Sequence, residues 1–352
     1  MVRPVRLDPI FSPRPWGSRS LAPFYPEKSN LTEPLGEAWL TGSECVFSDG
    51  PYAGLKLGEV WPKMDAGWAG TAISKDGPFP LLVKFIFAEE HLSVQVHPDD
   101  AYARAHEKLP SGEAAQGKTE MWYAVQARPG AGVLLGLKED VTSESLRKAI
   151  ADGTAEHSLE RVPMSPGDVI FVPAGTAHTI GPGLVLCEVQ QHSDLTYRVY
   201  DYNRRDAQGR SRELHVEKAL EVMRFGKQIG GKVAPARAEH DGVKETFYVA
   251  CRYFATEKWE FSKSAKAETS PERFELLVIL SGMGEIIWDD GRVPYAPADL
   301  WLMPAALGSY EVACAKPTSL LRTYVPKDPG EFARLAQQHG VDAAAASRLV
   351  YP

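Results

Sequence analysis

Short runs of strand-forming residues, separated by glycine and proline, recur along the chain and constrain its fold more than any other feature. Runs of this length and spacing are typical of β-sandwiches and β-barrels. The predicted strands are residues 81–87, 92–96, 121–125, 168–172 and 184–189 in the first half, and 246–250, 253–261, 274–280, 285–288 and 300–303 in the second. We therefore expect an all-β protein with two β-domains.

The length and an internal similarity support a duplicated domain. A chain of 352 residues is long enough for two domains that each bury a core. Residues 165–178 read SPGDVIFVPAGTAH and residues 296–307 read APADLWLMPAAL, each with a turn, an Asp, an apolar strand and Pro-Ala. The second copy has no histidine at the place of His178. We expect two related β-domains, of which only the first keeps a metal.

A helical pattern separates the two halves. Four apolar residues within segment 211–225 have the i, i+3, i+4, i+7 spacing of one helix face. They are Val216, Ala219, Leu220 and Met223. We expect a first domain at residues 1–210, a connecting helical segment at 211–235 and a second domain at 236–352. Accessory helices are predicted at 100–108, 142–151 and 330–338.

The composition argues against several classes of protein. A formal net charge of -7 is unsuited to general nucleic-acid binding, which needs a basic surface. No segment approaches the roughly 18 apolar residues of a membrane span, and residues 1–20 lack the apolar region of a secretory signal. The scattered Cys45, Cys187, Cys251 and Cys314 fit reduced thiols. We expect a cytoplasmic protein that binds neither nucleic acid nor a membrane.

Polar and apolar residues alternate in the segment LSVQVH, residues 92–97. Because side chains alternate between the faces of a strand, Ser93, Gln95 and His97 share one face. A polar face backed by an apolar one is compatible with a functional barrel interior. It is equally compatible with a half-exposed edge strand.

Residues 167–178 match the cupin pattern G-x5-P-x-G-x2-H, with Gly167, Pro173, Gly175 and His178 in place. The pattern describes a strand, a tight turn and a histidine at the start of the next strand. A single histidine is often a satisfied core residue. With the full pattern present, a metal role is favoured for His178, because imidazole is a common ligand of transition metals.

A carboxylate opens an apolar strand in GKTEMWY, residues 117–123. Lys118 and Glu120 are two residues apart and can point the same way. Together with Gln95, His97 and His178, Glu120 would supply two imidazoles, a carboxylate and an amide oxygen. That set suits one zinc ion per chain, or another divalent metal, with a coordination position left for water or substrate.

The segment 185–204 carries a further group of charged residues. Glu188 lies on a predicted strand and Arg198 on the next, so the two could meet across a hairpin. By spacing alone, a salt bridge on a solvated surface is the favoured interpretation. The arginines that follow are interpreted as a solvated loop; they are Arg204, Arg205, Arg210 and Arg212. Acidic neighbours would neutralise part of this charge, namely Asp201, Asp206 and Glu213.

At these residues the sequence resembles the type I phosphomannose isomerases (mannose-6-phosphate isomerases), in their shorter bacterial form. The matching segments are LSVQVHPDD at 92–100, GKTEMWY at 117–123, PAGTAHTI at 173–180 and DLTYRVYDYNR at 194–204. The resemblance covers most of the first 220 residues and, more loosely, the second domain. It implies two cupin (jelly-roll) β-barrel domains with a few accessory helices, the second of them degenerate.

The resemblance also implies an activity and a site. The activity is the interconversion of mannose 6-phosphate and fructose 6-phosphate through a metal-stabilised enediol. Zinc would be bound by Gln95, His97, Glu120 and His178. The active site would be lined by Ser93, Lys84, Lys118, Glu188 and Arg198, which replaces the surface interpretation of Glu188 and Arg198.

Isomerisation requires an open sugar ring, a proton moved between C1 and C2, and stabilised enediol oxygens. A divalent metal can polarise those oxygens. Glu188 and Lys118 are the candidate bases, with Glu188 favoured and Arg198 placing charge beside them. Lys84 and Arg198 are expected near the phosphate, although Lys84 in LLVKFIF also fits a residue that extends from a sheet to solvent.

One position departs from the longer members of the family, which carry a histidine just before the Lys of the GKTE-like motif. Here that residue is Gly117. Any ring opening assigned to that histidine must be done otherwise in this chain.

Alternative functions share parts of the same residue set. A cupin dioxygenase would use the His and Glu ligands with iron and consume oxygen. A non-catalytic sugar-phosphate sensor would bind without turnover, and a cupin isomerase of glucose 6-phosphate has the same residue types. The sequence allows a monomer or a homodimer.

Overall fold

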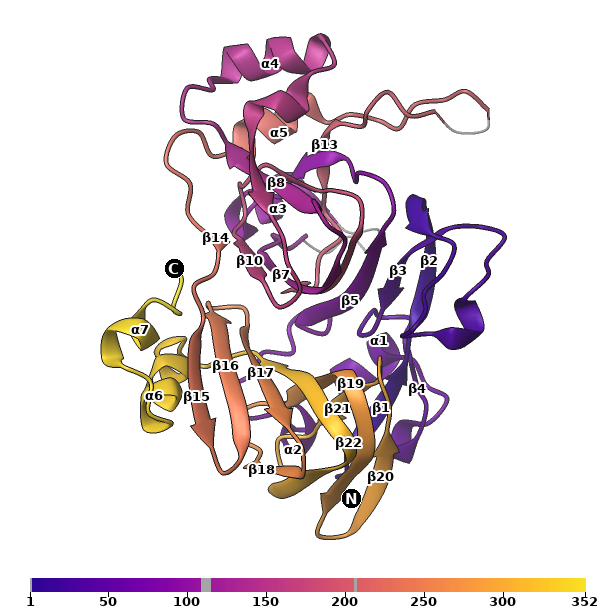
Figure 1. Ribbon diagram of the computed structural model, residues 1–352, viewed down its shortest axis with the longest axis vertical. Helices are drawn as coiled ribbons and strands as arrows, with labels where there is room; N and C mark the ends of the chain where they lie inside the picture. The colour runs from indigo at the N-terminus through magenta and orange to yellow at the C-terminus, as the bar shows by residue number, and fades with distance from the viewer. Residues whose placement is uncertain (1, 109–114, 206–207) are drawn as a thin grey trace.

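The computed structural model describes residues 2–108, 115–205 and 208–352 of the chain, which forms a mostly β protein with helices at its periphery (Figure 1). The strands form sheets of ten, seven and five members. The seven-stranded and five-stranded sheets belong to the first two thirds of the chain. The ten-stranded sheet is built mainly from the last third.

The seven-stranded sheet has the order β14-β10-β7-β12-β5-β3-β2. Its members are β2 (Ile10–Ser18), β3 (Leu35–Trp39), β5 (Leu81–Ala88), β7 (Glu120–Ala127), β10 (Val169–Val172), β12 (Leu184–Gln191) and β14 (Gly231–Lys232). Every residue of the central strand β5 is buried, which explains its nearly continuous apolar sequence. Strand β2 lies at the edge, where Pro13 and Pro15 remove no hydrogen bond that the sheet needs.

The five-stranded sheet has the order β13-β6-β11-β8-β9. Its members are β6 (Val94–Val96), β8 (Gly132–Leu137), β9 (Leu159–Pro163), β11 (His178–Ile180) and β13 (Tyr197–Tyr200). The backs of β6 and β13 pack on helices α4 (Ser143–Ala151) and α5 (Val216–Val222) through a cluster that includes Val94, Leu146 and Ala219. Val94 and Val96 therefore face this cluster, and the alternate residues of the segment face the other way.

The ten-stranded sheet follows the order β15-β16-β17-β22-β19-β21-β1-β4, with β18 beside β22 and β20 beside β19. Its members are β1 (Val5–Asp8), β4 (Val46–Phe47), β15 (Ala236–His240), β16 (Val243–Ala250), β17 (Ala255–Phe261), β18 (Ser264–Glu268), β19 (Glu275–Trp288), β20 (Gly291–Tyr295), β21 (Leu300–Met303) and β22 (Ser309–Tyr324). β1 and β4 come from the beginning of the chain. The two halves are thus joined by backbone hydrogen bonds as well as by the chain itself.

The remaining elements are short. They are α1 (Leu57–Val60), α2 (Ala66–Ala69), α3 (Asp100–His106), α6 (Gly330–Gln338), α7 (Ala343–Ser347), and the 3-10 turns Pro26–Lys28, Gly50–Tyr52, Trp61–Lys63 and Ala155–Ser158. Helices α6 and α7 lie beside β15 and β16 (Figure 1) and share a core with Phe247. No helix in the described part of the chain is long and apolar enough to cross a bilayer.

The predicted elements agree with this structure except in a few places. The expected strands 274–280 and 285–288 are one long strand, β19, whose pairing shifts between Ile279 and Gly284. The predicted helix 211–225 is shorter, because only Val216–Val222 is helical. The sheets are open, so the expected closed barrels are not formed. In the first half, two sheets instead face each other, as the contacts described next demonstrate.

Candidate active site

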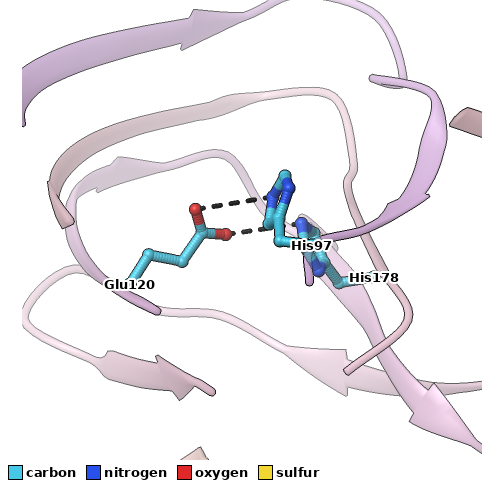
Figure 2. A group of neighbouring side chains, drawn as sticks. All are labelled: His97, Glu120 and His178. Atoms are coloured by element: carbon cyan, nitrogen blue, oxygen red, sulfur yellow. Dashed lines mark ion pairs between the residues drawn. The ribbon is translucent and has the colours of Figure 1, made fainter. Parts of the chain in front are cut away.

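Three side chains that are distant in the sequence converge between the seven-stranded and five-stranded sheets (Figure 2). His97, Glu120 and His178 are buried, and one ligand atom of each lies within 4.8 Å of the others. The Nε2 atom of His178 is 3.3 Å from Oε1 of Glu120, and Nε2 of His97 is 3.7 Å from Oε2. The arrangement is a carboxylate facing two imidazoles.

Each of the three residues occupies the end of a strand. Glu120 is the first residue of β7, His178 is the first of β11, and His97 directly follows β6. The turn before His178 depends on Gly175, whose φ of +85° is accessible to glycine at little cost. A Cβ at Gly175 would also lie 2.9 Å from the carbonyl oxygen of Val222.

Backbone carbonyls determine which nitrogen of each imidazole carries the proton. Nδ1 of His97 donates to the carbonyl of Leu195 at 2.8 Å, and Nδ1 of His178 donates to that of Thr176 at 2.9 Å. Burial lowers the pKa of His178 to about 4 and, together with the Lys118 ammonium, places the pKa of His97 well below its ordinary value. Both rings are therefore neutral at pH 7, with the unprotonated Nε2 of each near Glu120. The Lys118 ammonium lies 3.2 Å from Nε2 of His97.

Gln95 lies beside this group. Its register partner across β6 and β11 is His178, and its amide nitrogen is 3.2 Å from Nε2 of that residue. The two ends of an amide are assigned by their hydrogen bonds, and the opposite orientation would direct Oε1 to the same place. The four predicted ligands thus lie together.

The charge of the Glu120 carboxylate is only partly compensated by its neighbours. Neither of its oxygens accepts a hydrogen bond of good geometry from the described residues, although Oε2 forms an ion pair with Lys118 at 2.5 Å. Burial raises the pKa of Glu120, outweighing the opposite effect of Lys118, so a further cation would favour its ionised form. Two neutral imidazoles and an undercompensated buried carboxylate are a donor set that fits a divalent cation of the zinc type.

A second carboxylate, Glu188, adjoins the group. It is 2.8 Å from Nζ of Lys84 and 3.7 Å from Nζ of Lys118, and Trp122 Nε1 donates to it at 3.0 Å. Burial alone would raise the pKa of Glu188, but the two ammonium groups hold it below its usual range. Burial would likewise lower the pKa of Lys84, yet Glu188 and Glu37 raise it. Lys84 does not extend to solvent, because it is only 4% exposed.

The expected hairpin contact between Glu188 and Arg198 is wrong. Glu188 lies on β12 of the seven-stranded sheet, whereas Arg198 lies on β13 of the five-stranded sheet and pairs with Gln95. Glu188 pairs instead with Lys84 on β5. The turn after β12 carries the chain from one sheet to the other, a change of sheet that alternating hydrophobicity does not reveal.

A cavity of about 440 Å³ opens onto this group. Every predicted substrate or catalytic residue lines it: Ser93, Lys84, Lys118, Glu188 and Arg198, together with the ligand Gln95. Its wall also includes Arg212, which contradicts the expectation of a fully solvated arginine loop. An ion pair with Asp201 holds Arg212 in this place, and Asp201 also forms an ion pair with Arg204. The predicted neutralising Asp206 lies outside the described residues.

Several cavity residues were missed by sequence reasoning. They include Arg14, Glu37, Asp194 and Thr196. Asp194 and Thr196 belong to the DLTYR segment that was recognised only for Arg198. Glu37 and Arg14 come from β3 and β2, where no strand was predicted. The sequence around Glu37 and Arg14 gives no sign that they lie close to Lys84, which is more than 40 positions further along the chain.

The structure explains why position 117 is a glycine. A Cβ there would lie 2.5 Å from the backbone nitrogen of Asp100 and 2.5 Å from the carbonyl carbon of Asp99. The backbone of Gly117 also donates to the side chain of Asp100 at 2.9 Å. The fold therefore excludes any side chain at this position unless the backbone moves.

Known proteins resemble this chain over nearly its whole length. Residues 5–131 match the family "Phosphomannose isomerase type I, catalytic domain", and residues 244–324 match "Mannose-6-phosphate isomerase, cupin domain". Mannose-6-phosphate isomerase ManA of Bacillus subtilis is 36% identical over 317 residues, which are 88% of this chain and 95% of that protein. The chain belongs to the type I phosphomannose isomerases.

Solved structures of phosphomannose isomerases share the fold. The crystal structure of the Bacillus subtilis enzyme has a TM-score of 0.82 and 30% identity, covering 92% of this chain and 99% of that one. A zinc-bound mannose 6-phosphate isomerase has a TM-score of 0.72 at 16% identity, covering 92% of this chain and all of that one (100%). The mostly β, cupin-type fold of phosphomannose isomerases is therefore the fold of this chain.

Proposed function

We propose that this chain interconverts mannose 6-phosphate and fructose 6-phosphate. The observation that carries the proposal is the convergence of His97, Glu120 and His178. Glu120 contacts Lys118, which lines the neighbouring cavity together with Glu188. A cation site alone would suit many reactions. An acid-base pair beside it, in a cavity of sugar-phosphate size, suits the transfer of a proton between adjacent carbons.

Zinc is the proposed metal, held by His97, Glu120, His178 and the amide oxygen of Gln95. When bound, such an ion polarises the carbonyl and hydroxyl oxygens of the substrate. The proposal is supported by the two neutral imidazoles, by the undercompensated carboxylate and by the zinc-bound relative of the same fold.

Glu188 and Lys118 are the proposed proton carriers. Because its pKa is held low, Glu188 is ionised at neutral pH and can accept a proton. With the ligand atoms engaged by a cation, the Lys118 ammonium is left with Glu188, the carboxylate 3.7 Å away. A carboxylate and an ammonium at this separation can pass a proton through a small rotation of either side chain.

Arginines on the cavity wall are the proposed phosphate ligands. Nε of Arg198 is buried and lacks a hydrogen-bond partner among the described residues. Burial lowers the pKa of Arg198, and Arg212 beside it has the same effect, which indicates a concentration of positive charge. Lys84 is less suited than was expected, because Glu188 and Glu37 already surround its ammonium. Ser93 remains a proposed contact to the sugar.

A coupled assay on mannose 6-phosphate tests the function. The protein as purified should turn over, lose activity on prolonged chelation, and regain it when zinc is added. Oxygen uptake with iron in place of isomerisation would indicate a cupin dioxygenase. Tight binding of mannose 6-phosphate at full metal occupancy without product would indicate a sensor.

We also propose the domain division 1–210, 211–235 and 236–352, with one cupin-type domain in each half. The family matches at 5–131 and 244–324 support it. Because β1 and β4 hydrogen-bond into the C-terminal sheet, residues 236–352 alone would lack two strands and should be poorly soluble. Cytoplasmic location and a monomeric or dimeric state remain predictions, which cell fractionation and sedimentation would test.

A further inference from the structure

A line of alternating charges runs along the cavity wall and ends at the proposed metal ligand Glu120. In spatial order it consists of Arg14, Glu37, Lys84, Glu188, Lys118 and Glu120, with successive distances of 2.7, 3.5, 2.8, 3.7 and 2.5 Å. The inner members are the proposed catalytic groups and a metal ligand. The outer carboxylate, Glu37, has no part in the reaction proposed above.

Glu37 is placed by strand pairing. Lys84 on β5 is the register partner of Glu188 on one side and of Trp39 on the other. Glu37 precedes Trp39 by two residues and therefore projects from the same face of β3. The Lys84 ammonium consequently lies between two carboxylates, 2.8 Å from Glu188 and 3.5 Å from Glu37.

Glu37 is held as an anion despite its burial. Burial alone would raise its pKa, but Lys84 and Arg14 lower it below the ordinary value. Trp39 Nε1 also donates to it at 3.1 Å, and the Arg14 guanidinium is 2.7 Å away. Burying a charged carboxylate costs desolvation free energy, even when it is paired. We therefore expect Glu37 to have a function beyond stability.

We propose that Glu37 is a positioning residue of the isomerase. Because the Lys84 ammonium is attracted by Glu37 as well as by Glu188, the Glu188 carboxylate stays in its place close to Lys118. The inference rests on the proposed function. Without the charge of Glu37, Lys84 closes on Glu188 as its single counterion and draws that carboxylate toward β5. Arg14, also without its counterion, is then free to turn into the cavity.

Two variants at the same position test the proposal. Glu37→Gln keeps the size of the side chain and removes the charge, whereas Glu37→Asp keeps the charge and shortens the reach. A displacement of about 1 Å at a reacting group can cost on the order of 10²-fold in rate. We expect kcat to fall in the order wild type, Asp, Gln, by roughly 10²-fold for Gln, while KM for mannose 6-phosphate and zinc content change little.

A role in packing alone gives the opposite order. The isosteric Gln variant would then keep more activity than the shorter Asp variant, and that result would overturn the proposal. Glu44→Gln is the matched control, because it removes a carboxylate from an exposed ion pair with Lys56 in the same part of the chain. Its kcat should equal that of the wild type.

A conservative variant covers the case in which Glu37→Gln does not fold. Trp39→Phe removes the donor to Glu37 but keeps an aromatic ring in this half-buried position. A lower kcat at unchanged KM supports the proposal, and an unchanged kcat contradicts it. If the wild-type protein itself fails to isomerise mannose 6-phosphate, the proposed function is wrong. If the wild type is active but Glu37→Gln keeps a higher kcat than Glu37→Asp, only the proposed role of Glu37 is wrong.

Discussion

Glu275 occupies in the ten-stranded sheet the position that Glu120 occupies in the seven-stranded sheet. Glu120 pairs with Val172 at the end of GDVIFV, and Glu275 pairs with Met303 at the end of ADLWLM, the corresponding segment of the internal repeat. The equivalence extends to the neighbouring strands. Lys84 pairs with Glu188 in the first half, and Glu257 pairs with Arg322 in the second.

The second copy thus retains the buried charges. The signs of the Lys84–Glu188 pair are exchanged in Glu257 and Arg322, whereas Glu120 is matched by another carboxylate, Glu275. Nε of Arg322 donates to Glu275 at 2.8 Å, Nη1 donates to Glu257 at 2.8 Å, and the Tyr310 hydroxyl donates to Glu275 at 3.2 Å. The guanidinium faces the carboxylate equivalent to the proposed metal ligand. The chain itself thus supplies a permanent cation to this carboxylate, in the place of the metal proposed for the first half.

Removal of Arg322 should destabilise the protein severely. In Arg322→Ala, Glu257 and Glu275 stay buried without their cation, and loss of one partner of a buried ion pair typically costs about 3–5 kcal/mol. Urea unfolding measures the change. Arg334→Ala, which breaks an exposed pair with Asp328, should leave the stability nearly unchanged. Equal stability of Arg322→Ala and the wild type would show that the cluster is not a structural element.

Two carboxylate variants should separate metal binding from turnover. Glu120→Gln removes the charged ligand, so zinc content and activity should fall together. Glu188→Gln leaves the three convergent ligands intact, so zinc should remain bound while kcat falls by roughly 10²–10⁴-fold, the usual contribution of a positioned base. Metal analysis and the coupled assay on the same samples distinguish the two. Retained turnover in Glu188→Gln would exclude that residue as the base.

A side chain at position 117 should displace the backbone that adjoins the site. Gly117→Ala places a Cβ against the backbone of Asp99 and Asp100, and such overpacking typically costs about 1–3 kcal/mol. Thermal unfolding should register the loss, with a lower kcat because His97 and Lys118 adjoin the displaced backbone. Gly330→Ala, whose Cβ would meet only the ends of the Arg334 and Asp328 side chains, should leave both quantities nearly unchanged.

Asp100 should make stability depend on pH at the acid end. It accepts hydrogen bonds from Gly117, Gln191 and Tyr253, and although burial would raise its pKa these donors lower it. A carboxyl with a lowered pKa in the folded state stabilises the protein above its unfolded pKa, about 3.9. That contribution is lost as the pH falls through the folded value.

The variant Asp100→Asn tests this linkage. At pH 7 it should be less stable than the wild type by about 1–3 kcal/mol, because buried donors lose a charged acceptor. The difference should shrink below about pH 3.9, where the wild-type carboxyl also takes up a proton. Urea unfolding of both proteins at pH 7, 5 and 3 measures it. A difference that does not change with pH would contradict the assignment.

Elements with a strong apolar run were predictable from the sequence. Strands β5, β10, β12 and β21 lie at or within two residues of their predicted bounds, because a strand buried on both faces has a continuous apolar sequence. Strands β2 and β20 were missed because both contain proline. Each pairs along one edge only, so the sheet tolerates a residue that cannot donate a hydrogen bond.

By itself, the amino-acid sequence determined the mostly β class, the duplicated segment and the identity of the candidate ligands, because strand periodicity and motif spacing are local properties of the chain. Only the tertiary structure decided which charges share the site. It paired Glu188 with Lys84 rather than Arg198, brought Glu37 and Arg14 to the cavity, and opposed Arg322 to Glu275. Those choices follow from the register of strands distant in the chain, and register depends on how whole sheets pack.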